Sequence, residues 1–176
     1  MSRVRILGSL LMVGVLASCA VRPAQEVPPP APPAPAPELP PPPPPPAGAD
    51  WRDVPLTAGA WTYANSGGQS SAMFGPPGQP RFIVRCERSR EVTLLWVGAP
   101  AAQAITLRTT YGARSLAARA YQGPQPAVGA TVPASDPSLD AIAFSRGRFT
   151  VEAAGAPMLV IPAWPEPARV IEDCRA

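Results

Sequence analysis

A block of proline between residues 23 and 46 is the feature that most limits what this chain can fold into. Fifteen of the 28 prolines in the 176-residue chain lie in these 24 positions. Proline has no amide hydrogen and a fixed φ, so the block cannot form helix or sheet. It favours polyproline II at about 3.1 Å per residue, a reach of up to roughly 75 Å. We expect residues 19–49 to be a disordered, semi-rigid linker. A docking ligand for a proline-binding module is the alternative.

The residues before the proline block have the pattern of a secretory signal. Arg3 and Arg5 give a positively charged start, and an apolar run from residue 6 to residue 16 follows. This run is too short to cross a bilayer, which needs about 20 apolar residues, but it suits an export signal. The sequence therefore predicts a signal peptide over residues 1–18.

The end of that segment, Leu16-Ala17-Ser18-Cys19, resembles the bacterial lipobox, leucine–small–small–cysteine, at all four positions. The resemblance implies a lipoprotein: the Cys19 thiol receives a diacylglyceryl group, cleavage follows Ser18, and the new amino terminus is acylated, for example with palmitate. Three acyl chains anchor a protein essentially permanently. Ala20 stands where an aspartate would imply retention at the inner membrane. We therefore expect the outer membrane of a Gram-negative bacterium, with the folded part in the periplasm or at the cell surface. A simple signal peptide with a chance cysteine is the alternative.

The cysteine count agrees with a lipid anchor. The chain has three cysteines, Cys19, Cys86 and Cys174. Lipidation of Cys19 would leave two cysteines, which can pair with each other. The periplasm is oxidising, so a Cys86–Cys174 disulfide is expected, with two free buried thiols as the alternative. Because the chain has no histidine, two thiols make a poor metal site, and we expect no metal or cofactor.

The charge balance argues against nucleic acid. Fifteen arginines and no lysine stand against 12 acidic residues, and removal of the signal peptide leaves 13 arginines. The remaining arginines are scattered, whereas nucleic-acid binding requires a clustered basic face. The expected partners are the membrane, through Cys19, and an envelope protein or peptidoglycan.

Residues 50–176 are enough for one globular domain with a real core. Alternating apolar residues and short turns predict strands joined as hairpins. The clearest hairpins are 81–87 with 91–97, 104–109 with 114–118, and 148–153 with 157–163. Further strands are expected at 60–63, 71–74 and 128–132.

Two short helices interrupt this pattern. Residues 135–144 carry a cap candidate and a proline suited to the first turn, with Gly147 just beyond. Residues 165–174 form the second helix, which the disulfide would attach to the sheet. The sequence predicts a mainly β domain, a sandwich-like fold or open barrel of seven to nine strands, with two short helices.

The order short helix, basic–glycine turn, hairpin, terminal helix lies in residues 138–174, SLDAIAFSRGRFTVEAAGAPMLVIPAWPEPARVIEDC. This stretch resembles the C-terminal half of the invasion-associated locus B family of exported alphaproteobacterial proteins. The resemblance implies a β-sandwich-like fold. It implies no particular biochemical activity.

Catalytic patterns are not found in the sequence. Without histidine, the Ser-His-Asp, Cys-His and zinc arrangements are excluded. Asp136 and Asp140 are four residues apart, but beside a helix start they suit a cap and the helix dipole. We expect no catalytic residues and no enzyme activity.

The candidate site residues are Ser145, Arg146 and Arg148. Two arginines around the Gly147 turn can present a guanidinium fork to an acidic partner; a solvated connection is the alternative. The four tryptophans, by contrast, are expected in the core or at its rim.

Three functions fit these features. The first is an envelope lipoprotein that acts as a binding or structural module on a proline-rich stalk. The second is an inhibitor of host lysozyme, because residues 145–149 are loosely similar to the serine–glycine loop of such inhibitors. The third is a carrier of a small ligand.

Overall fold

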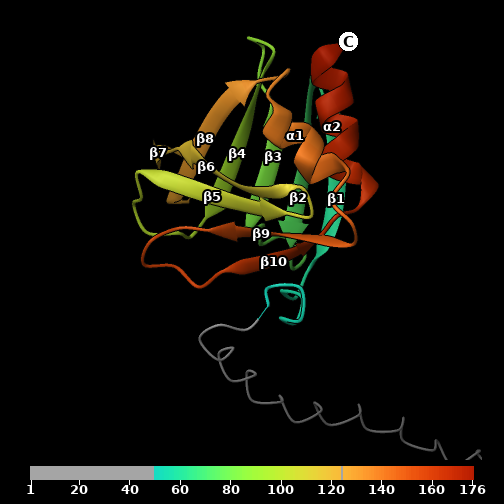
Figure 1. Cartoon of the computed structure of the whole chain (residues 1–176). Coiled ribbons are helices and arrows are strands. Elements are labelled where there is room, and N and C mark those ends of the chain that lie inside the picture. The colour runs from blue at the N-terminus through green and yellow to red at the C-terminus, as the bar shows by residue number, and fades with distance from the viewer. Residues whose placement is uncertain (1–49, 124) are drawn as a thin grey trace, which may run out of the picture. The chain divides into compact units, whose positions relative to one another are not determined.

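The computed structural model describes residues 50–123 and 125–176, which form ten strands and two helices (Figure 1). The strands make two antiparallel sheets that are not closed into a barrel. The expected signal peptide, the Cys19 anchor and the proline-rich linker lie outside the described residues.

The larger sheet has six strands in the order β1-β2-β3-β4-β8-β7. Hairpins join β1 to β2, β2 to β3 and β3 to β4, and the later strand β8 then pairs with β4. The strands are β1 (Ala60–Ser66), β2 (Gln69–Gly75), β3 (Phe82–Cys86), β4 (Glu91–Val97), β8 (Ala127–Pro133) and β7 (Arg119–Tyr121).

The smaller sheet has four strands in the order β10-β9-β5-β6. They are β5 (Ala104–Thr109), β6 (Gly112–Ala117), β9 (Arg148–Glu152) and β10 (Leu159–Pro162). Only Ala118 separates β6 from β7, so the chain passes from one sheet to the other in a single step. Figure 1 shows the strands of the smaller sheet running across those of the larger one.

The core lies between the two sheets. Period-2 alternation sends every second side chain of a strand inward, and at the centre Phe82 from the larger sheet meets Phe149 from the smaller one, with ring centroids 6.1 Å apart. Trp61 packs beside Phe74 at 5.5 Å, and its indole N–H donates to the Pro162 carbonyl across the sheets. Burying each such aromatic side chain stabilises the fold by about 1.5 to 3 kcal/mol.

The helices cover the part of the larger sheet that the smaller sheet leaves open. Helix α1 (Pro137–Ala143) begins after Asp136, whose carboxylate accepts from the Ser138 amide at 2.8 Å, so the predicted cap is confirmed. Helix α2 (Pro165–Arg175) packs on β1, β2 and β3 and against α1. Neither helix has the length and apolar composition that crossing a membrane requires, and the described residues contain no other helix.

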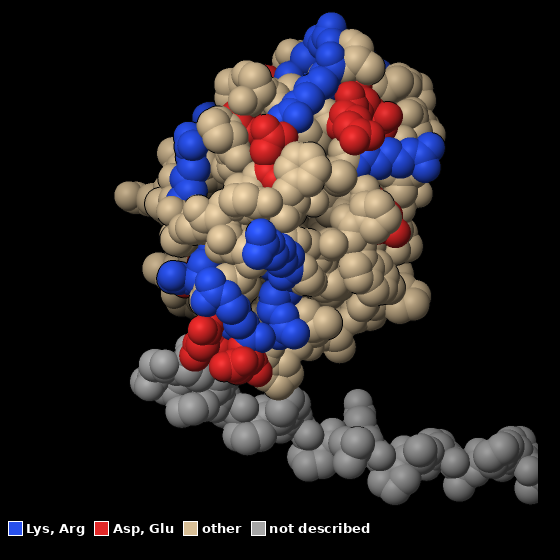
Figure 2. All heavy atoms as spheres, turned by 45° about the vertical axis from the view of Figure 1, so that its right-hand side comes forward, with Lys and Arg blue, Asp and Glu red and all other residues tan. Residues whose placement is uncertain are grey.

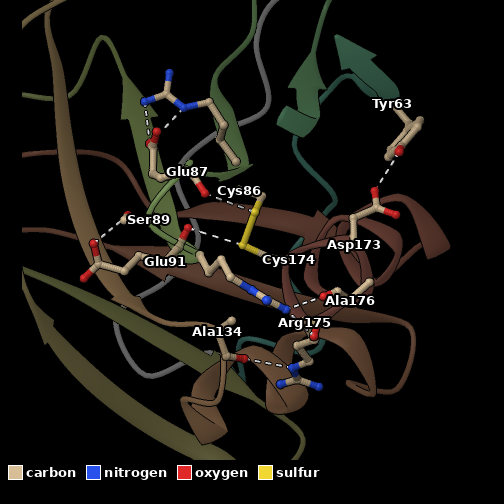
Figure 3. Close-up of a disulfide and its surroundings, with 12 residues drawn as sticks. Tyr63, Cys86, Glu87, Ser89, Glu91, Ala134, Asp173, Cys174, Arg175 and Ala176 are labelled. Carbon is tan, nitrogen blue, oxygen red and sulfur yellow. Dashed lines mark hydrogen bonds and ion pairs between the residues drawn. A yellow bond between two sulfur atoms is a disulfide. The ribbon is translucent and has the colours of Figure 1, made fainter. Parts of the chain in front are cut away.

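A disulfide joins α2 to the larger sheet. Cys174 on α2 is bonded to Cys86 at the end of β3, with 5.4 Å between the Cα atoms, so the predicted pairing is confirmed. Both cysteines are buried. Figure 3 shows the bond bridging helix and strand, and on the far side of the helix the Tyr63 hydroxyl donates to Asp173 at 2.7 Å.

The fold class agrees with the sequence prediction, but the strand count was too low. The described residues hold ten strands, and the one that was missed is β7. Strand β7 has three residues and follows β6 almost directly, so the sequence pattern does not separate it from β6. Of the two predicted arrangements, the observed one is two facing sheets.

We predict that the Cys86→Ala/Cys174→Ala double variant lowers the free energy of unfolding by about 2 to 5 kcal/mol, because the disulfide closes a long loop. Urea denaturation at pH 7 measures the change, and amide exchange should accelerate first in α2. Wild type with reductant should match the untreated double variant. A variant as stable as oxidised wild type would show that the helix is held without the bond.

Candidate interaction site

Three connections meet at one end of the smaller sheet. They are the β5–β6 turn, the loop from α1 to β9, and the junction from β10 to α2, all on the right-hand side in Figure 1. The Ala163 amide donates to the Gly147 carbonyl at 3.1 Å, which places the last two connections side by side. The sequence-predicted residues Ser145, Arg146 and Arg148 all lie here.

Ser145 joins the first two connections. Its side chain is 6% exposed; the hydroxyl accepts from the Thr110 amide at 3.2 Å and donates to the Arg148 carbonyl at 2.6 Å. The Arg146 amide donates to the Thr110 hydroxyl at 3.1 Å. These bonds fix the α1–β9 loop to the β5–β6 turn, so Ser145 has a structural role within the fold.

The two arginines have different surroundings. Arg148 is half-buried, and its Nη1 donates to the Val54 carbonyl at 2.7 Å. Arg146 is exposed, and among the described residues its guanidinium has no hydrogen-bond or ion-pair partner. One guanidinium is therefore held by the fold and the other is free to bind. Partner binding by these residues stays a prediction.

Exposed aromatic side chains lie on the same three connections as Arg146. Tyr111 and Phe144 are each 65% exposed and Trp164 is 46% exposed; in the part of the chain that the structure describes, the only other exposed large hydrophobic residue is Leu56. The three aromatics lie on the three connections that the hydrogen bonds hold together. We call Tyr111, Phe144, Arg146 and Trp164 the loop platform. Figure 2 turns this side forward and shows uncharged surface between groups of charged side chains.

The aromatic residues of the platform occupy helix caps and a tight turn. Phe144 is the C-cap of α1, and Tyr111 precedes Gly112, whose φ of 126° suits the tight turn. Trp164 is the N-cap of α2 and makes no side-chain cap hydrogen bond. An N-cap normally carries Ser, Thr, Asp or Asn. Trp164 therefore leaves the helix start without a side-chain cap, and it buries only about half of its indole ring.

Two acidic groups near the platform, Asp140 and Asp136, already have partners. Asp140 accepts from Arg175 at 2.8 Å and Asp136 from Arg114 at 3.2 Å. Partial burial of Asp136 opposes its charge, but hydrogen bonds from Ser138 and the nearby Arg114 together hold the pKa of the carboxyl below its usual value. Neither carboxylate pairs with Arg146, whose guanidinium has no ion-pair partner among the described residues.

Sequence reasoning found the arginine loop but missed the aromatics. Trp61 and Trp96 are buried at 5% and 4% exposure, as expected, whereas Trp164 is an exposed member of the platform. The sequence analysis assigns no binding role to Tyr111 or Phe144. The signal available was an aromatic residue at each of three element ends, where turn chemistry favours small polar residues.

The side chains of the site limit the chemistry it can offer. Among residues 50–123 and 125–176, no group of three or more His, Cys, Asp or Glu side chains is placed to hold a metal ion. The platform offers aromatic surface and a guanidinium, with no nucleophile–base pair.

Comparisons with known proteins add no relative. No protein-family model matches the chain, and searches of curated proteins and of solved structures found no match. The resemblance of residues 138–174 to the invasion-associated locus B family stays a prediction. A function for this chain is therefore argued from the arrangement of its own residues.

We predict that Ser145→Ala lowers the free energy of unfolding by about 1 to 3 kcal/mol, because the partly buried Thr110 amide and Arg148 carbonyl lose their partner. Urea denaturation at pH 7 measures this loss. Arg146→Ala, one position along the same loop, should change stability by less than about 0.5 kcal/mol. Equal effects of the two substitutions would mean that the hydroxyl does not hold the loops together.

Proposed function

We propose that this chain is an envelope lipoprotein of a Gram-negative bacterium, anchored at Cys19, whose domain binds another envelope protein through the loop platform. The lipobox-like end of residues 1–18 supports the anchor. The proline block supports a spacer of up to roughly 75 Å between membrane and domain. The domain supplies the binding surface.

The observation that carries the binding role is the exposed Trp164 at the N-cap of α2. A small polar side chain there would stabilise the helix start, and this tryptophan gives up that cap for exposed aromatic surface. Residues that break a local stability rule in this way often serve function. Tyr111 and Phe144 extend the same surface on neighbouring connections.

The composition of the platform favours a protein partner. Trp, Tyr and Arg are the residues enriched at binding hot spots, and exposed apolar surface rimmed by polar groups is typical of protein interaction sites. Because the Arg146 guanidinium is unpaired within the described residues, the partner should bring a carboxylate beside an apolar centre. Hydrogen bonds between the loops keep the platform ordered before binding, which lowers the entropy lost on association.

Two other functions receive less support from the contacts. A lysozyme inhibitor of the expected kind would insert Ser145 into the enzyme, but this hydroxyl is buried and bonded to Thr110 and Arg148. A carrier would hold its ligand between the sheets, where Phe82 and Phe149 fill the centre. Both remain alternatives to protein binding.

We predict that Trp164→Ser separates stability from binding. The serine hydroxyl can accept from the Glu166 amide, the one first-turn donor between Pro165 and Pro167, which stabilises the helix start by about 0.5 to 1 kcal/mol. Loss of the buried half of the indole offsets this gain, so the free energy of unfolding should change by less than about 1 kcal/mol. Binding should weaken by about 2 kcal/mol or more, as for a hot-spot tryptophan. Urea denaturation and cross-linking in isolated envelopes measure the two effects.

The cross-linking compares wild type, Trp164→Ser, Arg146→Gln and the control Arg81→Gln, an exposed arginine just before β3 of the other sheet. One envelope protein should be captured by wild type and the control, and lost with both platform variants. Titration of that purified protein should then reproduce the order of affinities. Capture that Trp164→Ser and Arg146→Gln leave unchanged would refute the platform as the docking surface.

We also predict that Cys19→Ser abolishes membrane attachment. Wild type should fractionate with outer membranes and carry the added mass of a diacylglyceryl and an acyl group, because several acyl chains together give stable anchoring. The variant should lose both properties, as measured by membrane fractionation and intact-mass spectrometry. Cys86→Ala/Cys174→Ala is the control and should keep the lipid; lipid-free wild type would rule out the anchor.

A further inference from the structure

The outer face of the larger sheet, turned away from the helices and the smaller sheet, carries a polar hollow. Ser71, Arg85, Thr93 and Thr131 stand opposite one another across β2, β3, β4 and β8, so their side chains form one row. The hollow over this row has a volume of about 630 Å³. An adjoining hollow of about 360 Å³ shares Thr93 and Thr131 and extends the surface to β7.

Tyr121 on β7 closes one side of this surface. Its hydroxyl accepts from Arg85 Nη2 at 2.7 Å, and the same guanidinium donates to Glu87 at 2.6 Å. A Cβ at position 129 would lie 2.7 Å from the Leu95 side chain and 3.7 Å from the Cβ of Tyr121, so Gly129 leaves room for both side chains on this face. Tyr121 and Arg85 thus bridge the sheet from its edge to β3.

The Arg85 guanidinium keeps its positive charge. Partial burial opposes it, but hydrogen bonds to Tyr121 and Glu87 raise the pKa of the guanidinium above its usual value. Arg88 in the β3–β4 turn and Arg119 on β7 add two exposed guanidinium groups, which have no hydrogen-bond or ion-pair partner among the residues that the structure describes. The hollow is therefore flanked by free cations.

The polar groups of the hollow retain unused hydrogen-bonding capacity. Thr93 and Thr131 share one hydrogen bond at 3.0 Å, which leaves one hydroxyl proton to donate elsewhere. The Tyr121 hydroxyl accepts from Arg85 and keeps its own proton to donate. Glu91 accepts from Ser89 through one carboxylate oxygen, so the other can still accept. Donors, acceptors and cations thus face the same space.

This chemistry selects the kind of ligand. Glutamate is depleted at the centres of protein interfaces, whereas here Glu87 and Glu91 line the surface itself, beside Arg85, Arg88 and Arg119. The hydroxyls of a sugar can pair with such a mixed set, and a carboxylate can pair with a free guanidinium. An open hollow also suits an extended chain better than an enclosed small molecule.

We propose that this hollow binds a carboxylate-bearing saccharide, with Arg88 and Arg119 pairing with carboxylates and Tyr121 and Thr131 donating to sugar oxygens. It shares no residue with the loop platform, so either surface can bind when the other does not. The sugar can come from peptidoglycan, whose lactyl and peptide groups carry carboxylates, or from a polymer of uronic acids.

Calorimetric titration of the full-length protein tests this proposal with three probes. They are tetragalacturonate, a disaccharide–peptide fragment of peptidoglycan, and neutral chitotetraose. At least one acidic probe should bind with a dissociation constant below about 1 mM, at least tenfold tighter than chitotetraose, and raising the salt should weaken it. The acidic probe that binds more tightly identifies the source of the sugar.

Variants then locate the binding. Arg88→Gln and Arg119→Gln should each weaken the acidic probe by about tenfold, a loss of about 1.4 kcal/mol, and Tyr121→Phe should weaken it while the fold is kept. Arg81→Gln, at the other end of β3, should bind like wild type. Thermal unfolding of each variant verifies that it is folded.

Two results would overturn the proposal. One is the failure of both acidic probes to bind wild type below about 10 mM. The other is binding that the Arg88→Gln/Arg119→Gln double variant leaves within about twofold of wild type, which would place the sugar elsewhere.

Discussion

The attachment of α2 to the larger sheet is the constraint on which the other functional geometry depends. The Cys86–Cys174 bond holds one end of the helix, and contacts with β1, β2 and β3 hold its length. This placement sets the start of the helix, where Trp164 stands, and gives α1 the surface against which it packs. The end of α1 then positions Phe144 and the loop that Ser145 fixes to Thr110. A disulfide far from the platform thus helps to order it.

The domain presents two surfaces of opposite character. The loop platform is aromatic with one free cation, and it lies where three connections meet. The hollow on the outer face of the larger sheet is polar and holds three arginines and two glutamates. A lipoprotein that binds an envelope protein with one surface and an acidic saccharide with the other would connect membrane, protein and polymer. The proposed proline-rich spacer would suit such a role, because it would let the domain reach away from the proposed anchor.

Much of the local structure was readable from short-range patterns. The strands at 91–97 and 104–109 were predicted with the bounds that the structure gives, because apolar residues and turn signals bound them clearly. Helix α1 was predicted from a cap and a proline, and both act as expected. Strand β7 was missed because three residues that continue from β6 carry no boundary of their own. The hydrogen bond between Ser145 and Thr110 was not readable either, because it joins residues 35 positions apart in the chain.

By itself, the sequence determined the properties that depend on neighbouring residues or on composition. The proline content of residues 23–46 disfavours helix and sheet there. Local patterns also predict the hairpins, the mainly β class and two cysteines that can form a disulfide. Tertiary structure alone decided that the connections carrying Phe144, Trp164 and Tyr111 meet, and that Tyr121 reaches Arg85 across the sheet. Such pairings join residues tens of positions apart. They follow from strand order and from the way the two sheets and two helices share one core, which no local pattern encodes.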